Sequence, residues 1–244
     1  MMLLIDIGNT NTVYSLYHNN NYTINKRITP EQNINTIIDE LSDYNITHVA
    51  IASVVPKKTK SYLKLCKEHF DINPFILSYQ NTNIKLKVDS QEEVGADRIC
   101  NAKAAIKETS KNCLVIDFGT ATTYDIINEK QEFIGGAIAP GIEVSALYLI
   151  QKAALLKNTI LEFPTSYIGS NTTTNIQSGV MYSAIHGIEG MVENIKKELN
   201  QEIYIILTGG FSKLLSSRLS FKHQLKPNLT IEGLRIIYEE YLNE

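Results

Sequence analysis

Two short apolar runs in the chain end in the same kind of polar turn. Residues 3–12 read LLIDIGNTNT, and residues 114–123 read LVIDFGTATT. An unbroken apolar run of this length is typical of a strand buried on both faces, and the Asp, Gly, Asn and Thr residues that follow favour a tight turn. The sequence therefore predicts strand, turn and strand at both places, offset by 117 − 6 = 111 residues.

The pattern of elements after the two turns is also the same. In the first half we expect two further strands, a helix and a strand: residues 13–17, 22–28, 30–42 and 48–53. In the second half we expect the same order: strands 124–127 and 133–139, a helix with apolar positions spaced 3, 4, 3 and 4 from Ile185 to Leu199, and strand 203–207. A matched order of elements indicates a duplicated α/β unit. We place the boundary near Lys111, giving domains 1–111 and 112–244.

A helix is expected where the two halves join. Residues 90–93 read SQEE, which has the Ser-x-x-Glu form of a capping box, and Ile99, Ala102 and Ile106 follow at helical spacing. The pattern predicts one helix over residues 91–109.

Composition narrows the class of protein. The 244 residues carry 23 Lys and Arg against 26 Asp and Glu, a formal net charge of −3, and 43% of them are hydrophobic. This composition is typical of a globular protein and provides no basic surface for nonspecific binding of nucleic acid or an anionic membrane. The apolar runs are too short to span a bilayer, so we expect a cytoplasmic protein with neither a nucleic-acid nor a membrane partner. The three cysteines are expected to be reduced, buried thiols.

The duplicated Asp-x-Gly turns carry the candidate chemistry. A carboxylate at the end of a buried strand is unfavourable unless it meets a cation, a proton or several donors, and this applies to both Asp6 and Asp117. Small residues after each Asp let backbone N–H groups and Thr hydroxyls approach phosphate oxygens, and Asp6 is suited to Mg²⁺. For one copy an ordinary hairpin turn would be the better interpretation. Two copies facing one another across a cleft, with residues 208–210 as a third close approach, favour phosphate binding.

Six motifs, in order, resemble those of type III pantothenate kinases, which belong to the acetate and sugar kinase, Hsp70 and actin superfamily. The motifs cover essentially the whole chain: residues 6–10, 95–98, 117–122, 135–141, 169–172 and 208–210. The resemblance implies two ribonuclease-H-like domains of actin-like ATPase fold, with the active site in the interdomain cleft. It also implies ATP-dependent phosphorylation of pantothenate at its 4′-hydroxyl, the first step of coenzyme A biosynthesis, by a homodimer that uses Mg²⁺ and a monovalent cation, K⁺ or NH₄⁺.

The resemblance further assigns roles to individual residues. It implies ATP binding by nine residues: Asp6, Ile7, Gly8, Asn9, Thr10, Asn11, Thr12, Val13 and Thr120. It implies substrate binding by five: Gly95, Ala96, Asp97, Arg98 and Thr172. Asp117 would hold the monovalent cation and Asp6 would lie near Mg²⁺. Asp97 would be the general base that takes the proton of the attacking hydroxyl, and the planar fork of Arg98 suits a substrate carboxylate.

Two other functions are left open by the residues. Without the family pattern, Asp97 and Arg98 would be an exposed pair in the first turn of a helix, and Val88 stands where the family often has a pocket tyrosine. The alternatives are a nucleotide-binding regulatory accessory factor without kinase turnover and a kinase of another small hydroxylated substrate. The presence of both Asp97 and Asp117 favours turnover.

Overall fold

The computed structural model describes residues 1–29, 35–153 and 159–243. Its chain forms two compact units. The first contains Met1–Ser110, Lys130–Ile134 and Asn228–Glu244, and the second contains Lys111–Glu129 and Gly135–Pro227. Residues 130–134 and 228–244 therefore cluster with the first unit, although they follow the predicted boundary in sequence. The division of the sequence into two repeats, residues 1–111 and 112–244, stays a prediction.

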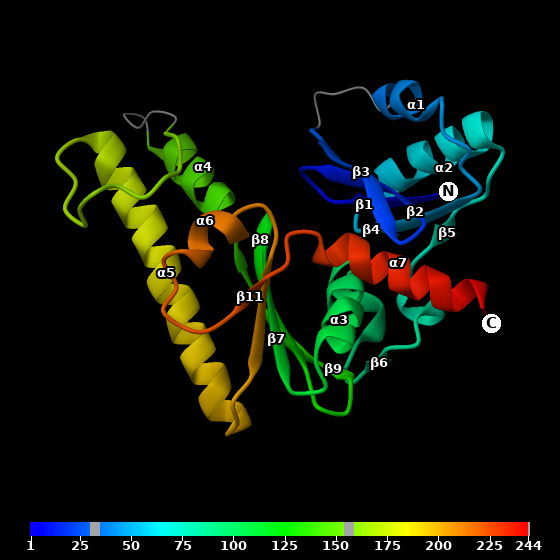
Figure 1. Ribbon diagram of the computed structural model, residues 1–244. Coiled ribbons are helices and arrows are strands. Elements are labelled where there is room, and N and C mark those ends of the chain that lie inside the picture. Colours follow the sequence, from blue (N-terminus) through cyan, green and yellow to red (C-terminus); the bar gives the residue numbers. More distant parts are fainter. Residues whose placement is uncertain (30–34, 154–158, 244) are drawn as a thin grey trace. The chain divides into compact units, whose positions relative to one another are not determined.

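The first unit is built on a five-stranded sheet with β1 at its centre (Figure 1). The order is β3-β2-β1-β4-β5, and the strands are β1 Met2–Ile7, β2 Thr12–His18, β3 Asn21–Ile28, β4 His48–Ser53 and β5 Phe75–Ile76. Strand β1 pairs antiparallel with β2 and parallel with β4. Asn19 and Asn20 adopt positive φ in the hairpin between β2 and β3, where Asn is well tolerated.

Helices cover both faces of this sheet. Leu3, Ile5 and Ile7 of β1 pack in one core with side chains of α1 (Asn35–Leu41) and α2 (Pro56–Phe70). On the opposite face α3 (Ala96–Glu108) and α7 (Leu229–Leu242) pack on one another and on β4. The unbroken apolar run of β1 is explained by this burial, since Leu3, Leu4 and Ile5 are all 0% exposed.

The second sheet has the same topology with one strand added. Its order is β11-β10-β7-β8-β9-β6, and its strands are β6 Lys85–Leu86, β7 Cys113–Phe118, β8 Ala121–Ile127, β9 Glu132–Pro140, β10 Tyr204–Thr208 and β11 Gln224–Leu225. Read from β9 to β11, this is the order β3-β2-β1-β4-β5 of the first sheet. In both sheets the Asp at the end of the central strand pairs with a residue on each neighbouring strand: Asp6 with Val13 and Ala52, and Asp117 with Thr123 and Thr208. The predicted duplication of an α/β unit is thus confirmed.

Within its described residues the second unit contains three helices: α4 Ile142–Lys152, α5 Thr172–Leu199 and α6 Ser212–Ser216. The apolar residues predicted on α5 lie in the core of the second unit. There Ile185, Ile188 and Val192 pack with Leu114 and Ile116 of β7. Helix α5 has both ends fixed locally, because Asn171 caps its start and Asn200 ends it in the left-handed conformation.

The single helix expected over residues 91–109 is wrong. Gln91–Glu93 form a 3₁₀ turn (η2), another such turn lies at Tyr79–Asn81 (η1), and the α-helix begins only at Ala96. Ser90 makes no side-chain cap bond, and Gln91 instead donates to the carbonyl of Leu86 over 2.9 Å. The capping-box residues are therefore engaged in a turn that leads to α3. Of the helix expected over residues 30–42, residues 30–34 lie outside the described part and the rest forms α1.

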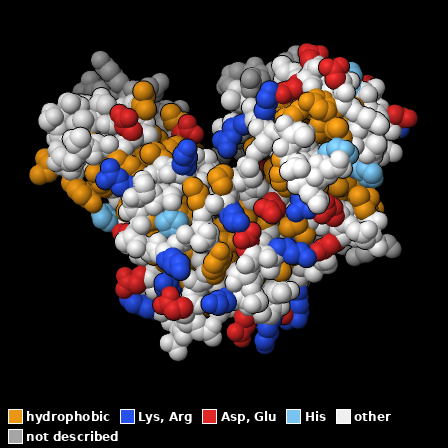
Figure 2. Space-filling model, viewed as in Figure 1, with side chains coloured by type: hydrophobic (Ala, Val, Ile, Leu, Met, Phe, Trp, Pro, Cys, Tyr) orange, Lys and Arg blue, Asp and Glu red, His pale blue; other side chains and the backbone are white. Residues whose placement is uncertain are grey.

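The surface and the cysteines agree with the composition. All three cysteines are free and buried. No helix in the described part of the chain has both the length and the apolar character needed to cross a bilayer. Charged side chains of both signs are interspersed over the face that Figure 2 shows, in keeping with a net charge of −3.

The contact between α3 and α7 yields a first prediction. A Cβ at Gly233 of α7 would overlap the carbonyl oxygen of Cys100 in α3, so Gly233→Ala must separate the two helices. We expect the free energy of unfolding to fall by about 1–3 kcal/mol, measured by urea denaturation. The control is Gly190→Ala in α5, where an added Cβ meets nothing within 4 Å. That change should raise stability by about 0.5–1 kcal/mol through helix propensity. Equal effects of the two substitutions would contradict the close approach.

Candidate active site

The two Asp-x-Gly turns that are expected to bind phosphate are called phosphate-type turns below. The first of them lies between β1 and β2 in the first unit. The N–H of Gly8 donates to the carbonyl of Asn11 over 2.9 Å and closes the turn. Asn9 and Thr10 are exposed at its tip, whereas Asp6 is half-buried where β1 leaves the core. The predicted loop, residues 6–13, is therefore a hairpin that presents backbone and polar side chains to solvent from a rigid central strand.

Asp97 lies in the first turn of α3, directly after Gly95, which is the residue before the helix, and Ala96. Its Oδ1 accepts the backbone N–H of Arg98 over 2.8 Å. Burial raises the pKa of the Asp97 carboxyl, and the hydrogen bond and charge of Arg98 only partly oppose that rise. A carboxylate with a raised pKa is a better proton acceptor than an ordinary exposed Asp.

The charges of Asp6 and Asp97 both act on the buried thiol of Cys100. Burial raises the pKa of Cys100 well above its usual value, and the charges of Asp6 and Asp97 both add to that rise. Two carboxylates that lie 91 positions apart (97 − 6) thus act on the same side chain. In the first unit, the charge of Asp97 and the charge of Asp6 in the first turn therefore affect the same buried thiol.

Arg98 is held by an aromatic ring that the sequence did not reveal. Its guanidinium carbon lies 5.3 Å from the centre of the Phe133 ring, and Phe133 is 1% exposed. Phe133 reaches this position because Leu86 of β6 pairs with it. A cation–π contact of this kind orients the planar guanidinium.

The second phosphate-type turn lies between β7 and β8 in the second unit. The N–H of Gly119 donates to the carbonyl of Ala121 over 3.0 Å, and the N–H of Gly141 donates to the carbonyl of Thr120 over 3.0 Å. Thr120 is exposed, and Asp117 is half-buried at the end of the core strand. Gly209 has φ of 87°, and a Cβ there would overlap Oδ1 of Asp117. Gly209 therefore lies against Asp117 in the second unit, and Thr120 lies in the turn that follows Asp117.

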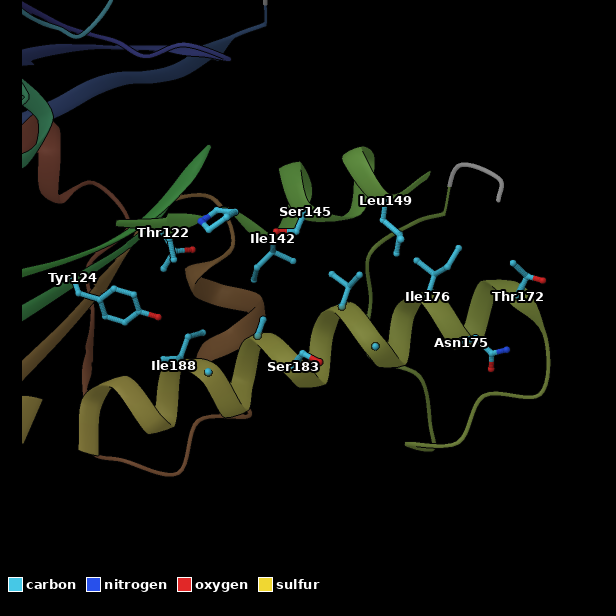
Figure 3. A pocket seen from close by; sticks show the side chains of 16 residues that line it. Thr122, Tyr124, Ile142, Ser145, Leu149, Thr172, Asn175, Ile176, Ser183 and Ile188 are labelled. Carbon is cyan, nitrogen blue, oxygen red and sulfur yellow. The ribbon is translucent and has the colours of Figure 1, made fainter. Parts of the chain in front are cut away.

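A groove of about 760 Å³ runs along α5 in the second unit (Figure 3). Thr172 and Asn175 lie at one end of it, and Tyr124 and Ile188 lie at the other. The wall opposite α5 includes Ile142 and Ser145 of α4. Of the predicted site residues in this unit, Thr172 lines the groove, whereas Asp117 and Thr120 lie at the β7–β8 turn. Thr172 is exposed as the first residue of α5, directly after the capping Asn171, whose Oδ1 accepts the N–H of Thr174 over 3.0 Å.

Within residues 1–29, 35–153 and 159–243, no three His, Cys, Asp or Glu side chains gather as ligands for a metal ion. Mg²⁺ commonly uses only one or two carboxylates together with substrate phosphates and water. The half-buried carboxylate of Asp6 fits that mode of binding.

Several solved structures share the fold of this chain. A Baf family protein from Campylobacter jejuni matches with a TM-score of 0.65 and 21% identity, covering 99% of this chain and 100% of that chain. MreB 5 of Spiroplasma citri matches with 0.53 and 12%, covering 99% and 97%. The ethanolamine utilization protein EutJ from Carboxydothermus hydrogenoformans matches with 0.52 and 13%, covering 96% and 89%. These similarities confirm the predicted actin-like ATPase fold.

The sequence relatives are closer. The family model for type III pantothenate kinase matches residues 2–194. The type III pantothenate kinase of Syntrophotalea carbinolica is 36% identical over 250 residues, which cover 98% of each chain. That of Halalkalibacterium halodurans is 35% identical over 252 residues, covering 98% of this chain and 99% of the relative. This chain belongs to the type III pantothenate kinase family, and it is a kinase.

Proposed function

We propose that this chain transfers the γ-phosphoryl group of ATP to the 4′-hydroxyl of pantothenate, the first step of coenzyme A biosynthesis, in the cytoplasm. Family membership supports the substrates. The observation that carries the chemistry is the half-buried Asp97 carboxyl, whose pKa is raised and whose charge acts on the same thiol as that of Asp6.

Asp97 acts as the general base. As the bond forms between the 4′-oxygen and the γ-phosphorus, the bond from that phosphorus to the ADP oxygen breaks, and the hydroxyl proton moves to Asp97. Burial keeps the carboxylate poorly solvated, so its affinity for a proton is higher than that of an exposed Asp. A positioned base of this kind contributes about 10²–10⁴ in rate.

The two turns bind the phosphates of ATP. Residues 6–13 and Thr120 offer backbone N–H groups and hydroxyls, which suit phosphate oxygens. Asp6 would hold Mg²⁺, which neutralises phosphate charge when it is bound. Asp117 would hold the monovalent cation, K⁺ or NH₄⁺.

Polar side chains bind the pantothenate moiety. Arg98, oriented over Phe133, pairs with the substrate carboxylate through its fork of donors. Gly95 and Ala96 are small residues and keep the approach of the substrate to Asp97 and Arg98 open. The hydroxyl of Thr172 contacts the substrate from the end of the groove.

Asp97→Asn tests the assignment of the base. The unsubstituted protein should consume ATP when pantothenate is added, and more rapidly with K⁺ than without it. The asparagine keeps the size and an acceptor oxygen but cannot take a proton, so kcat should fall about 10²–10⁴-fold while ATP still binds. A coupled assay for ADP and calorimetric titration of ATP give the two readouts.

Glu93→Gln is the matched control, because Glu93 is an exposed carboxylate four residues before Asp97. It should keep kcat within about twofold. Full phosphotransfer by Asp97→Asn would overturn the assignment. If the unsubstituted protein binds ATP but consumes none with pantothenate, sugars or acetate, the regulatory accessory factor becomes the better interpretation. Turnover only with another acceptor would identify a different kinase.

The raised pKa of Asp97 predicts opposite effects of pH on activity and stability. The value of kcat/KM should fall in acid with an apparent pKa above the ordinary range of Asp, because the base must be ionised. A raised pKa in the folded state means that the stability contributed by the protonated carboxyl is lost as pH rises through that pKa. Asp97→Asn should therefore have a higher Tm than the unsubstituted protein at neutral pH, and the difference should shrink in acid. A difference in Tm that is independent of pH would contradict the linkage.

We further propose a homodimer formed through the second unit. Helix α4 exposes large apolar side chains, with Leu147 at 52% and Tyr148 at 61% exposure, and an added Cβ at Gly179 or Gly187 of α5 would meet nothing within 4 Å. Contiguous exposed apolar residues of this kind are typical of protein interfaces.

Light scattering should give a mass of 2 × 27.4 = 54.8 kDa. Leu147→Asp combined with Tyr148→Asp should reduce it to the monomer, because each buried charge would lack a partner. Tyr241→Asp, at an equally exposed position in the first unit, should leave the dimer intact. A dimer that survives the α4 substitutions would place the interface elsewhere.

A further inference from the structure

Lys58 binds the backbone of the first phosphate-type turn. It lies in the first turn of α2, and its Nζ donates to the carbonyl of Gly8 over 3.1 Å and to that of Asn9 over 2.9 Å. Its side chain is half-buried, whereas Lys57 and Lys60 on the same helix are exposed. One ammonium group thus spans two consecutive carbonyl oxygens at the tip of the turn.

The segment that joins β4 to α2 holds a third carbonyl of the same turn. The N–H of Val54 donates to the carbonyl of Ile7 over 3.2 Å. The carbonyl oxygens of Ile7, Gly8 and Asn9 therefore all accept hydrogen bonds from residues 54–58. Three consecutive peptide groups are fixed from one side.

Because peptide groups are planar and trans, the direction of these carbonyls also fixes the direction of the backbone N–H groups in the turn. In each peptide the C=O and the N–H point in opposite directions. With the carbonyls of Gly8 and Asn9 turned toward Lys58, the N–H groups of Asn9 and Thr10 are directed to the other side. Successive N–H groups on one side of a turn form a concavity suited to phosphate oxygens.

We propose that Lys58 is a positioning residue for the nucleotide. It holds the Gly8 and Asn9 carbonyls so that the N–H groups of the turn face the phosphates of ATP, and its positive charge also favours an anion at the turn. This inference rests on the proposed function only in so far as residues 6–13 bind ATP; it does not depend on the acceptor.

The test compares three variants in nucleotide binding and in turnover. Lys58→Met keeps the length of the side chain and removes its donors, so the Kd and KM for ATP should rise about tenfold, the loss expected for charge-assisted hydrogen bonds. The KM for pantothenate should change less than about twofold. Lys58→Arg retains charge and donors and should stay within about threefold of the unsubstituted protein. Lys57→Met, an exposed neighbour, should leave the Kd for ATP unchanged.

Hydrogen exchange separates positioning from a general loss of structure. In Lys58→Met the amides of residues 8–12 should exchange faster, with β1 and β4 as protected as before. Unchanged affinity for ATP in folded Lys58→Met would overturn the inference, as would an equal loss of affinity in Lys57→Met. If Lys58→Met does not fold, weak binding by folded Lys58→Gln supports the inference and normal binding overturns it. If the unsubstituted protein binds ATP but does not phosphorylate pantothenate, the proposed acceptor is wrong and the Lys58 inference is still decided by the affinities.

Discussion

The free-energy cost of placing a carboxylate at the end of a fully buried strand is the constraint on which the rest of the structure depends. Strand β1 lies at the centre of its sheet with helices on both faces, and β7 lies between β8 and β10 in the other sheet. Asp6 and Asp117 stand where these strands leave the core, paired with neighbours on both sides. Each carboxylate is thereby fixed by a strand that cannot shift without exposing apolar surface. The sheet, rather than a flexible loop, sets the position of the candidate chemistry.

The features predicted correctly were those encoded in short stretches of sequence. The central strands, the hairpins and the apolar face of α5 follow from apolar runs and from the spacing of apolar residues, both visible within about a dozen residues. The duplication followed because both copies carry the same local pattern. The roles of Asp97 and Arg98 stay a prediction that rests on the family motif alone, since their spacing is equally typical of an exposed helical turn.

The features that sequence reasoning missed depend on contacts between distant segments. Helix α2 has only a narrow apolar face, formed by Tyr62, Leu65 and Cys66, within a stretch rich in lysine. Nothing local marks Lys58 among its neighbours, because its role comes from carbonyls 50 positions away. Phe133 was expected only as part of a strand, and its contact with Arg98 arises from the pairing of β6 with β9. The helix expected from residue 91 begins only at Ala96, because residues Gln91–Glu93 form a 3₁₀ turn instead.

The place of α7 has a consequence for how the protein is made. This helix covers β1 and β4 of the first unit, yet in the chain it follows the whole second unit. A ribosome therefore releases the sheet of the first unit well before it synthesises the helix that shields one of its faces. During that interval, apolar residues such as Leu4 and Ala50 have no cover from α7. The first unit is the first to begin folding, and it cannot be completed until residues beyond the second unit have emerged.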